Sequence, residues 1–320
     1  MSERQRTAVG RPKGRVAKLL GLVALVGLAA TGCSGDEVLR FGWPVGVTHE
    51  ADRMRDLWTW SVVAALIVGV IVWALILWPV IAHRKRGDEL PRQFQYNHGL
   101  EWIYTGLPVV IVVVLFAFTT SAQNYVNAEV RDPDVTVDVL ATQWNWSFGY
   151  IDVKGFQGAK GSAPVAPDGE MVRTVGNPAE IPMLVLPVNK RIEYRLHSND
   201  VIHSFFVPEF HFKRDVFPYP EKNNQDSTFQ NTIDRTGSFV GRCAELCGTY
   251  HSQMNFEVRV LPAAVFDQYV QLRTQTNPQT NKPYTAPEAL TKLNCGELCT
   301  PHAVTTTPFN TDRTARNPSG

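Results

Sequence analysis

The residues best suited to chemistry lie in one run of twelve. It holds two thiols, an imidazole and a thioether, in the order Cys243, Cys247, His251 and Met254. A second imidazole, His203, lies forty residues earlier in the chain. Thiolate, imidazole and thioether ligands together favour copper, because soft ligands select it over hard cations, and zinc seldom takes a methionine. The sequence therefore predicts a copper site.

The cysteines also allow other interpretations. A disulfide between Cys243 and Cys247 is the plain alternative in an oxidising compartment, but the histidine and methionine at fixed spacing favour a metal. A covalent haem would need C-x-x-C-H, and that string is absent from the sequence. Cys295 and Cys299 partly repeat the spacing without the methionine, and we expect a disulfide there; a second metal site and free or intermolecular thiols are the alternatives.

The first segment, residues 1–32, has the features of an export signal. Basic residues precede an apolar run from Leu19 to Ala30, which is too short to cross the ~30 Å hydrocarbon core as a helix. The residues before Cys33 resemble the lipobox of bacterial lipoproteins, which predicts that Cys33 is acylated. The alternative is an ordinary signal peptide that leaves Cys33 as a thiol.

Two further apolar runs, Leu57 to Ala82 and Ile103 to Ala122, are long enough to span a bilayer, so residues 33–122 should hold a transmembrane hairpin. The loop between them, 83–100, is basic and should be cytoplasmic, which places the rest of the mature chain outside. Glu101 stands at the cytoplasmic mouth of the second helix. It is either a solvated carboxylate favoured by the helix dipole or a group that takes up protons.

Beyond the hairpin, short alternating segments with turn signals predict an all-β sandwich over residues 123–273. A segment rich in Gly, Pro and Ala, 152–180, interrupts it as a surface insertion, and Pro262–Arg273 suits a short helix. Residues 274–320 are expected to be an extended tail with a helical turn over Pro287–Leu293. The expected strands are Val135–Leu140, Trp144–Tyr150, Met183–Leu186, Arg191–His197, His203–Val207, Ser227–Ile233, Ser238–Arg242 and Phe256–Leu261.

Composition excludes some classes of protein. The 320 residues carry 31 Lys+Arg and 30 Asp+Glu, a net charge of +1, which gives no basic excess for binding nucleic acid. A hydrophobic content of 44% is too low for a carrier built mostly of membrane helices.

The ligand run, C-A-E-L-C-G-x-x-H-x-x-M, together with the upstream D-V-x-H-S-F, resembles subunit II of cytochrome c oxidase, which carries a dinuclear copper centre called CuA. Signal, helix hairpin, β-domain and ligand loop also follow the family's order. The resemblance implies a cupredoxin-like sandwich after the hairpin, and the lipoprotein signal, insertion and tail resemble actinobacterial members. The copper ligands that it implies are His203, Cys243, the carbonyl of Glu245, Cys247, His251 and Met254.

The resemblance also implies roles for other residues. The Glu245 side chain would hold a magnesium ion at the interface with subunit I. Trp144 would be the residue through which electrons enter, and Asp200 would face the electron donor. Glu101 would stand at the start of a proton path, which favours the second of its two interpretations.

The function implied is electron transfer within an oxidase of the bacterial plasma membrane. CuA, on the extracytoplasmic side, would accept electrons from a cytochrome c donor and pass them to haem a in subunit I. That subunit would use its haem groups and CuB to reduce oxygen to water, coupled to proton translocation. The chain would then be enzymatic only as a subunit, with haem confined to its partners. Those partners are subunits I and III, membrane lipid and a donor, which in actinobacterial relatives is a dihaem cytochrome c subunit of a bc1-type complex in a supercomplex.

Two other functions compete with this interpretation. A metal-free subunit II of the quinol-oxidase type keeps the fold but lacks the two cysteines. A membrane-anchored copper carrier would need a labile, accessible site, for which a six-ligand dinuclear centre is poorly suited.

Overall fold

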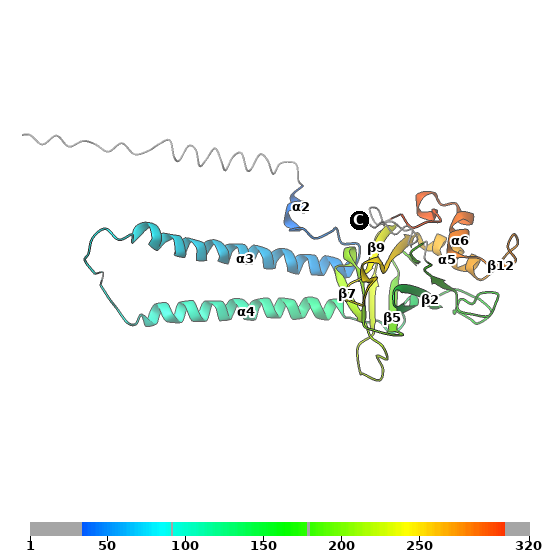
Figure 1. Cartoon of the computed structure of the whole chain (residues 1–320), viewed down its shortest axis with the longest axis horizontal. Helices are drawn as coiled ribbons and strands as arrows, with labels where there is room; N and C mark the ends of the chain where they lie inside the picture. The colour runs from blue at the N-terminus through cyan, green and yellow to red at the C-terminus, as the bar shows by residue number, and fades with distance from the viewer. Residues whose placement is uncertain (1–33, 91, 178–179, 305–320) are drawn as a thin grey trace, which may run out of the picture. The chain divides into compact units, whose positions relative to one another are not determined.

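The computed structural model describes residues 34–90, 92–177 and 180–304. The segment before Pro44 forms a unit of its own, which holds the short helix α2 (Gly35–Leu39) with a capping box between Ser34 and Glu37. From Pro44 on, two long helices are followed by a β-domain (Figure 1). The predicted signal, 1–32, and Cys33 lie outside the described residues.

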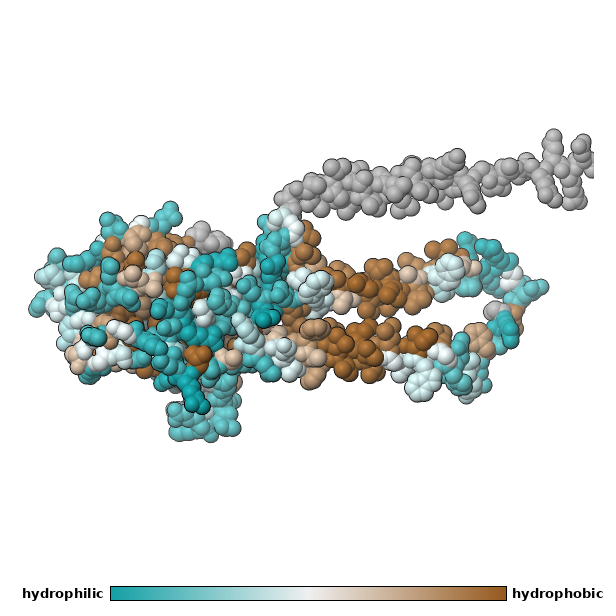
Figure 2. All heavy atoms as spheres, turned by 180° about the vertical axis from the view of Figure 1, so that it is seen from behind, coloured by the Kyte–Doolittle hydropathy of each residue, from teal (hydrophilic) through white to brown (hydrophobic). Residues whose placement is uncertain are grey.

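The two long helices are α3 (His49–Ala82) and α4 (His98–Val126), and each is long and apolar enough to cross a membrane. Apolar side chains gather along the middle of both helices, and the loop between them is hydrophilic (Figure 2). Both helices begin earlier than their apolar runs, because the side chains of Thr48 and Asn97 accept a hydrogen bond from the first turn. The predicted helix hairpin is therefore confirmed, with polar turns added at its ends.

The β-domain is a sandwich of two five-stranded sheets, as predicted. One sheet has the order β3-β2-β1-β5-β8 and the other β4-β10-β9-β6-β7. The strands are β1 (Val135–Thr142), β2 (Asn145–Val153), β3 (Arg173–Val175), β4 (Met183–Pro187), β5 (Arg191–Ser198), β6 (His203–Val207), β7 (Phe212–Val216), β8 (Thr228–Thr232), β9 (Gly237–Cys243) and β10 (Asn255–Leu261).

Aromatic side chains from both sheets fill the core of the sandwich. Trp146 on β2 is fully buried, and its ring centroid lies 5.2 Å from that of Phe256 on β10 and 6.1 Å from that of Phe205 on β6. Its indole N–H donates to the carbonyl of Met254 at 3.1 Å. Such pairs each contribute about 0.5–1.5 kcal/mol beyond burial. Trp146 thus connects the aromatic core to the end of the predicted ligand loop at Met254.

Charged groups attach the hairpin to the sandwich. The Glu50 carboxylate, 4% exposed in the first turn of α3, accepts the N–H of Thr232 on β8 at 3.1 Å and pairs with Arg191 on β5. Arg191 also donates to the carbonyl of Ala128, two residues beyond α4. Because breaking a buried ion pair leaves an uncompensated charge, this contact favours one fixed attachment of helices to sheet.

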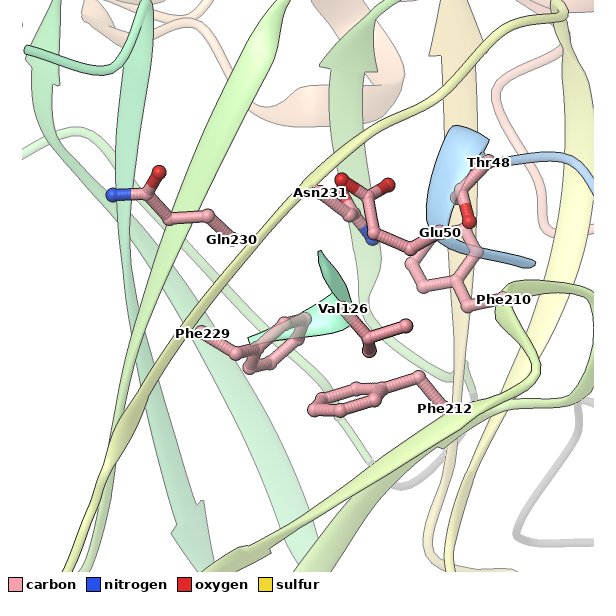
Figure 3. A pocket seen from close by; sticks show the side chains of 8 residues that line it. All are labelled: Thr48, Glu50, Val126, Phe210, Phe212, Phe229, Gln230 and Asn231. Carbon is pink, nitrogen blue, oxygen red and sulfur yellow. The ribbon is translucent and has the colours of Figure 1, made fainter. Parts of the chain in front are cut away.

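The same junction encloses a cavity of about 10 Å³, room for one water at most (Figure 3). Val126, the last residue of α4, lies in it beside the rings of Phe212 and Phe229. The other lining residues are Thr48, Glu50, Phe210, Gln230 and Asn231. The junction is therefore well packed.

The C-terminal region differs from the extended tail that we expected. After α5 (Ala263–Arg273), a two-stranded ribbon of β11 (Thr276–Asn277) and β12 (Lys282–Pro283) leads into α6 (Ala286–Leu293) and the 3-10 turn η4 (Gly296–Cys299). Residues 284–299 contribute buried side chains to the core, among them Leu290 and Cys299.

An arginine holds the last described residues in place. Arg259 on β10 is fully buried, pairs with Glu257, and donates to the carbonyls of Leu298 and Thr300 at 2.9 Å and of His302 at 3.1 Å. The sequence concealed this packing, because the partner lies far back in the chain.

Candidate metal centre

The predicted ligands meet where two loops converge at one end of the second sheet. His203 is the first residue of β6 and Cys243 the last of β9, and the pairing of Phe205 with Cys243 brings these strand ends together. Cys247 and His251 lie in the loop from β9 to β10. The neighbouring strands thus join an imidazole and a thiol that are forty residues apart in sequence.

The side chains in this cluster lie within reach of a shared metal centre. The two sulfurs, Cys243 Sγ and Cys247 Sγ, are 3.7 Å apart, far beyond the S–S bond length of about 2.05 Å. His203 Nδ1 lies 3.8 Å from Cys243 Sγ, and His251 Nδ1 lies 3.5 Å from Cys247 Sγ. Met254 Sδ is 3.8 Å from Cys247 Sγ. Each thiol therefore has one imidazole beside it.

Backbone hydrogen bonds close the ligand loop. The N–H of Cys243 donates to the carbonyl of Met254 at 3.0 Å, and the N–H of Ala244 donates to Ser204 on β6 at 3.1 Å. Within the loop, the 3-10 helix η3 (His251–Gln253) lies just before β10. The ligand positions are therefore set by the backbone.

Burial and charge distinguish the two thiols. Burial raises the pKa of a thiol, but at Cys243 the hydrogen bonds with His203, the backbone of Glu245 and Ser204, and Cys247 together outweigh it and lower the pKa to about 7. At Cys247, burial and the charge of Cys243 act together and raise the pKa. For His203, burial lowers the pKa, but Cys243 and Asp200 outweigh it and raise the pKa. Cys243 is thus the first thiol to ionise.

The donor set fits copper. Two sulfurs, the thioether of Met254 and His203 are buried, and the carbonyl of Glu245 lies 3.3 Å from Cys243 Sγ. These are soft or intermediate ligands shielded from water, the set that copper takes in electron-transfer sites. The Glu245 side chain, by contrast, is exposed to solvent.

Trp144 lies directly against the ligand loop. Its indole N–H donates to the carbonyl of Cys247 at 3.0 Å, and the Gln143 side chain donates to the same oxygen at 2.8 Å. The ring of Tyr250 meets the indole edge-on, with centroids 4.9 Å apart. A Cβ on Gly248 would lie 3.1 Å from the indole, so glycine permits this close approach.

Asp200 lies beside His203 and inside the same network. Its carboxylate faces His203 Nε2 at 2.8 Å and accepts the backbone N–H groups of Gln143 and Val201, each at 2.7 Å. Its side chain is 29% exposed.

Three of the sequence-predicted residues lie away from the cluster. Glu101 is in the first turns of α4, where its carboxylate accepts the N–H of Asn97 at 2.9 Å and lies 3.2 Å from His98 Nδ1. Cys295 and Cys299 form a disulfide at η4. Among the described residues, the clustered His, Cys and acidic side chains that could hold a metal are His203, Cys243 and Cys247.

The roles of Gln143 and Tyr250 beside the ligand loop were not predicted from the sequence. Each directly precedes a residue that the sequence did single out, Trp144 or His251. Their contacts, however, link the β1–β2 turn to the ligand loop, and local sequence carries no signal for such a contact.

A cupredoxin-like sandwich with clustered Cys and His side chains that could hold a metal, attached to two membrane-type helices, defines the class of protein. A family model described as "Cytochrome C oxidase subunit II, periplasmic domain" matches residues 135–261. "Probable cytochrome c oxidase subunit 2" of Nocardia farcinica is 47% identical to this chain, over 95% of this chain and 91% of its own length. "Cytochrome c oxidase subunit 2" of Mycobacterium tuberculosis is 42% identical, over 97% and 93%.

The chain therefore belongs to the cytochrome c oxidase subunit II family, whose members are parts of an oxidoreductase complex. Among solved structures, the periplasmic domain of subunit II of cytochrome oxidase from Bradyrhizobium japonicum is 27% identical, with a TM-score of 0.34. That match covers 45% of this chain and 95% of the solved one.

Proposed function

We propose that this chain is the electron-accepting subunit of its oxidase. In this proposal the chain would hold a dinuclear copper centre, which would supply a one-electron carrier between a cytochrome c donor and haem a in subunit I. Four such electrons and four protons convert one oxygen molecule to two waters there, with proton translocation coupled to the reaction. The observation that carries the proposal is the convergence of two unbonded thiols, each with its own imidazole, at a buried site.

The protein's contribution is to hold the donor atoms in advance. Cys243 and Cys247 would bridge two coppers, His203 and Met254 would complete one, and His251 with the carbonyl of Glu245 would complete the other. When bound, such a pair of metals supplies a one-electron carrier. The backbone-closed loop and the buried sulfurs limit rearrangement and exclude water.

Trp144 would be the residue through which electrons enter. The indole hydrogen bond to the Cys247 carbonyl supports this role, because it joins the ring to the peptide of a ligand. Asp200, near the same turn, supplies a negative charge for a basic donor surface. The donor itself is proposed to be a cytochrome c, bound as a dihaem subunit of a bc1-type complex in a supercomplex.

The remaining roles follow from family membership and from charge. The basic segment 83–100 would be cytoplasmic, so that the copper domain would lie on the extracytoplasmic side of the plasma membrane. Glu101 would then take up protons from the cytoplasm. The exposed Glu245 carboxylate would hold magnesium against subunit I, and subunit III would complete the complex. Removal of 1–32 and acylation of Cys33 would add a lipid anchor.

Counting copper tests this function directly. The full chain in detergent is loaded with copper, the metal is counted per chain, and the EPR spectrum is recorded. Two equivalent coppers sharing one unpaired electron give seven hyperfine lines, because each nucleus has a spin of three halves. A variant with Cys295→Ser and Cys299→Ser is the control for unspecific thiol binding and should keep the spectrum.

A single copper with four lines would contradict the proposal and indicate a mononuclear site or a carrier. No bound copper would favour the metal-free, quinol-oxidase-type function. In either case the roles given to Trp144 and Glu245 would be withdrawn with it.

A further inference from the structure

We propose that Asp200 is a positioning residue that fixes the ligand histidine and the Trp144 turn at the same time. This role goes beyond a negative charge for an incoming donor. It concerns what the Asp200 carboxylate does inside the protein.

The hydrogen bonds of the carboxylate reach three parts of the chain. One oxygen, Oδ1, lies 2.8 Å from His203 Nε2 and accepts the N–H of Val201 at 2.7 Å. The other oxygen, Oδ2, accepts the N–H of Gln143 at 2.7 Å. Both oxygens thus accept hydrogen bonds from the protein's own donors, and Ser198 Oγ also donates to Oδ1 at 3.3 Å.

The contact with His203 sets which ring nitrogen can bind a metal. A carboxylate accepts hydrogen bonds, so the neutral imidazole beside it carries its proton on Nε2. The lone pair is then on Nδ1, the atom that lies 3.8 Å from Cys243 Sγ. Groups that hold a ligating histidine in this way typically change metal affinity 10–100-fold when removed.

The contact with Gln143 places the β1–β2 turn. Asp200 accepts the N–H of Gln143, the residue directly before Trp144. The indole N–H of Trp144 donates to the carbonyl of Cys247 at 3.0 Å. One carboxylate therefore sets both the imidazole on one side of the cluster and the indole on the other. Its charge matters, because hydrogen bonds to an ionised acceptor are roughly twice as strong as neutral ones.

The test compares Asp200→Ala, Asp200→Asn and the control Asp226→Asn. Asp226 pairs with Arg214, and its side chain is 63% exposed, so the control removes a surface charge without touching the cluster. Asp200→Asn keeps an oxygen that can accept from His203, and it guards against misfolding of the alanine variant. Circular dichroism and thermal unfolding of the full chain in detergent verify folding.

The first readout needs no metal and so stands apart from the proposed function. Histidine side chains are labelled with ¹⁵N in the copper-free full chain, at a pH where His203 is neutral, and His203→Gln assigns the signal. We expect a single Nε2–H tautomer in the unaltered protein and in Asp226→Asn, and a mixture of tautomers in Asp200→Ala. A single Nε2–H tautomer in Asp200→Ala would overturn the proposal.

The second readout rests on the proposed copper function. Copper affinity should fall about 10- to 100-fold in Asp200→Ala, less in Asp200→Asn, and not at all in Asp226→Asn. If Asp200→Ala left the copper affinity unchanged but altered the ionic-strength dependence of electron uptake, only a docking role for Asp200 would remain. Failure of the unaltered chain to bind copper would refute the proposed function, while the tautomer result would still decide the role of Asp200.

Discussion

Gly248 offers a test of how the loop and the indole fit together. Its φ is +115°, and a Cβ there would lie 3.1 Å from Trp144 Cζ2 and 3.3 Å from Trp144 Nε1. Gly248→Ala therefore adds backbone strain of about 1–3 kcal/mol. It also displaces the indole from the Cys247 carbonyl, a hydrogen bond worth about 1 kcal/mol. We expect a total destabilisation of about 2–4 kcal/mol.

Gly169→Ala is the matched control, because Gly169 has a φ of +87° and open space where the Cβ would lie. Both variants should lose stability through strain, measured by thermal unfolding of the full chain. Only Gly248→Ala should slow electron uptake from reduced cytochrome c in stopped-flow mixing with the assembled oxidase, with copper content preserved. Equal uptake rates for the two variants would refute the claim that the close approach of the indole matters.

Four further predictions concern the ligands, the proton path and stability. Cys247→Ser should lose the dinuclear copper, since an alcohol is a poor bridge for a soft metal; two coppers and an unchanged EPR spectrum would contradict this. Glu101→Ala should slow oxidase turnover and proton uptake with an unchanged copper spectrum, and normal turnover would leave the residue as a helix cap. Arg259→Leu should lower the unfolding free energy by about 3–5 kcal/mol, because Glu257 and several carbonyls lose a buried partner. Replacing Glu257 as well should restore part of this loss. Unaltered stability of the Arg259→Leu variant would count against the importance of the pair. Burial raises the pKa of Glu209, whose Oε2 has no hydrogen-bond partner among the residues that the structure describes. Its contribution to stability is therefore present below the unfolded pKa of about 4.3 and is lost as pH rises through the folded value. Glu209→Gln should therefore raise the free energy of unfolding at pH 7, by about 1 kcal/mol or less at this partly exposed site, and change it little at pH 4. A rise at pH 4 alone would reverse the assigned sign.

The architecture was largely predictable because its signals are local. Apolar runs long enough to cross a bilayer define α3 and α4, and alternation defines most of the strands. Two strands of the sandwich were missed for physical reasons. β7 is an edge strand with three charged residues in its middle, as exposed edges often are, and β3 has three residues beside an insertion without periodicity. The C-terminal region looked like a tail, because Arg259, which holds its end, is forty residues earlier.

The clustering of the candidate ligands was predictable for a different reason. Metal chemistry limits the residue types and spacings, so Cys243 to Met254 could be identified without a fold. The contacts around the ligands could not. Asp200 was expected to face a partner, and its inward hydrogen bonds depend on the turn between β1 and β2 lying beside the β5–β6 loop.

We propose that electrons enter the oxidase through a copper centre held by this chain. The most direct measurement is rapid mixing of reduced cytochrome c with the fully oxidised oxidase complex, following the copper absorbance and haem a separately. Our account predicts that the copper centre is reduced first and that haem a follows at the expense of the copper signal. Reduction of haem a with no earlier change at copper would contradict the account.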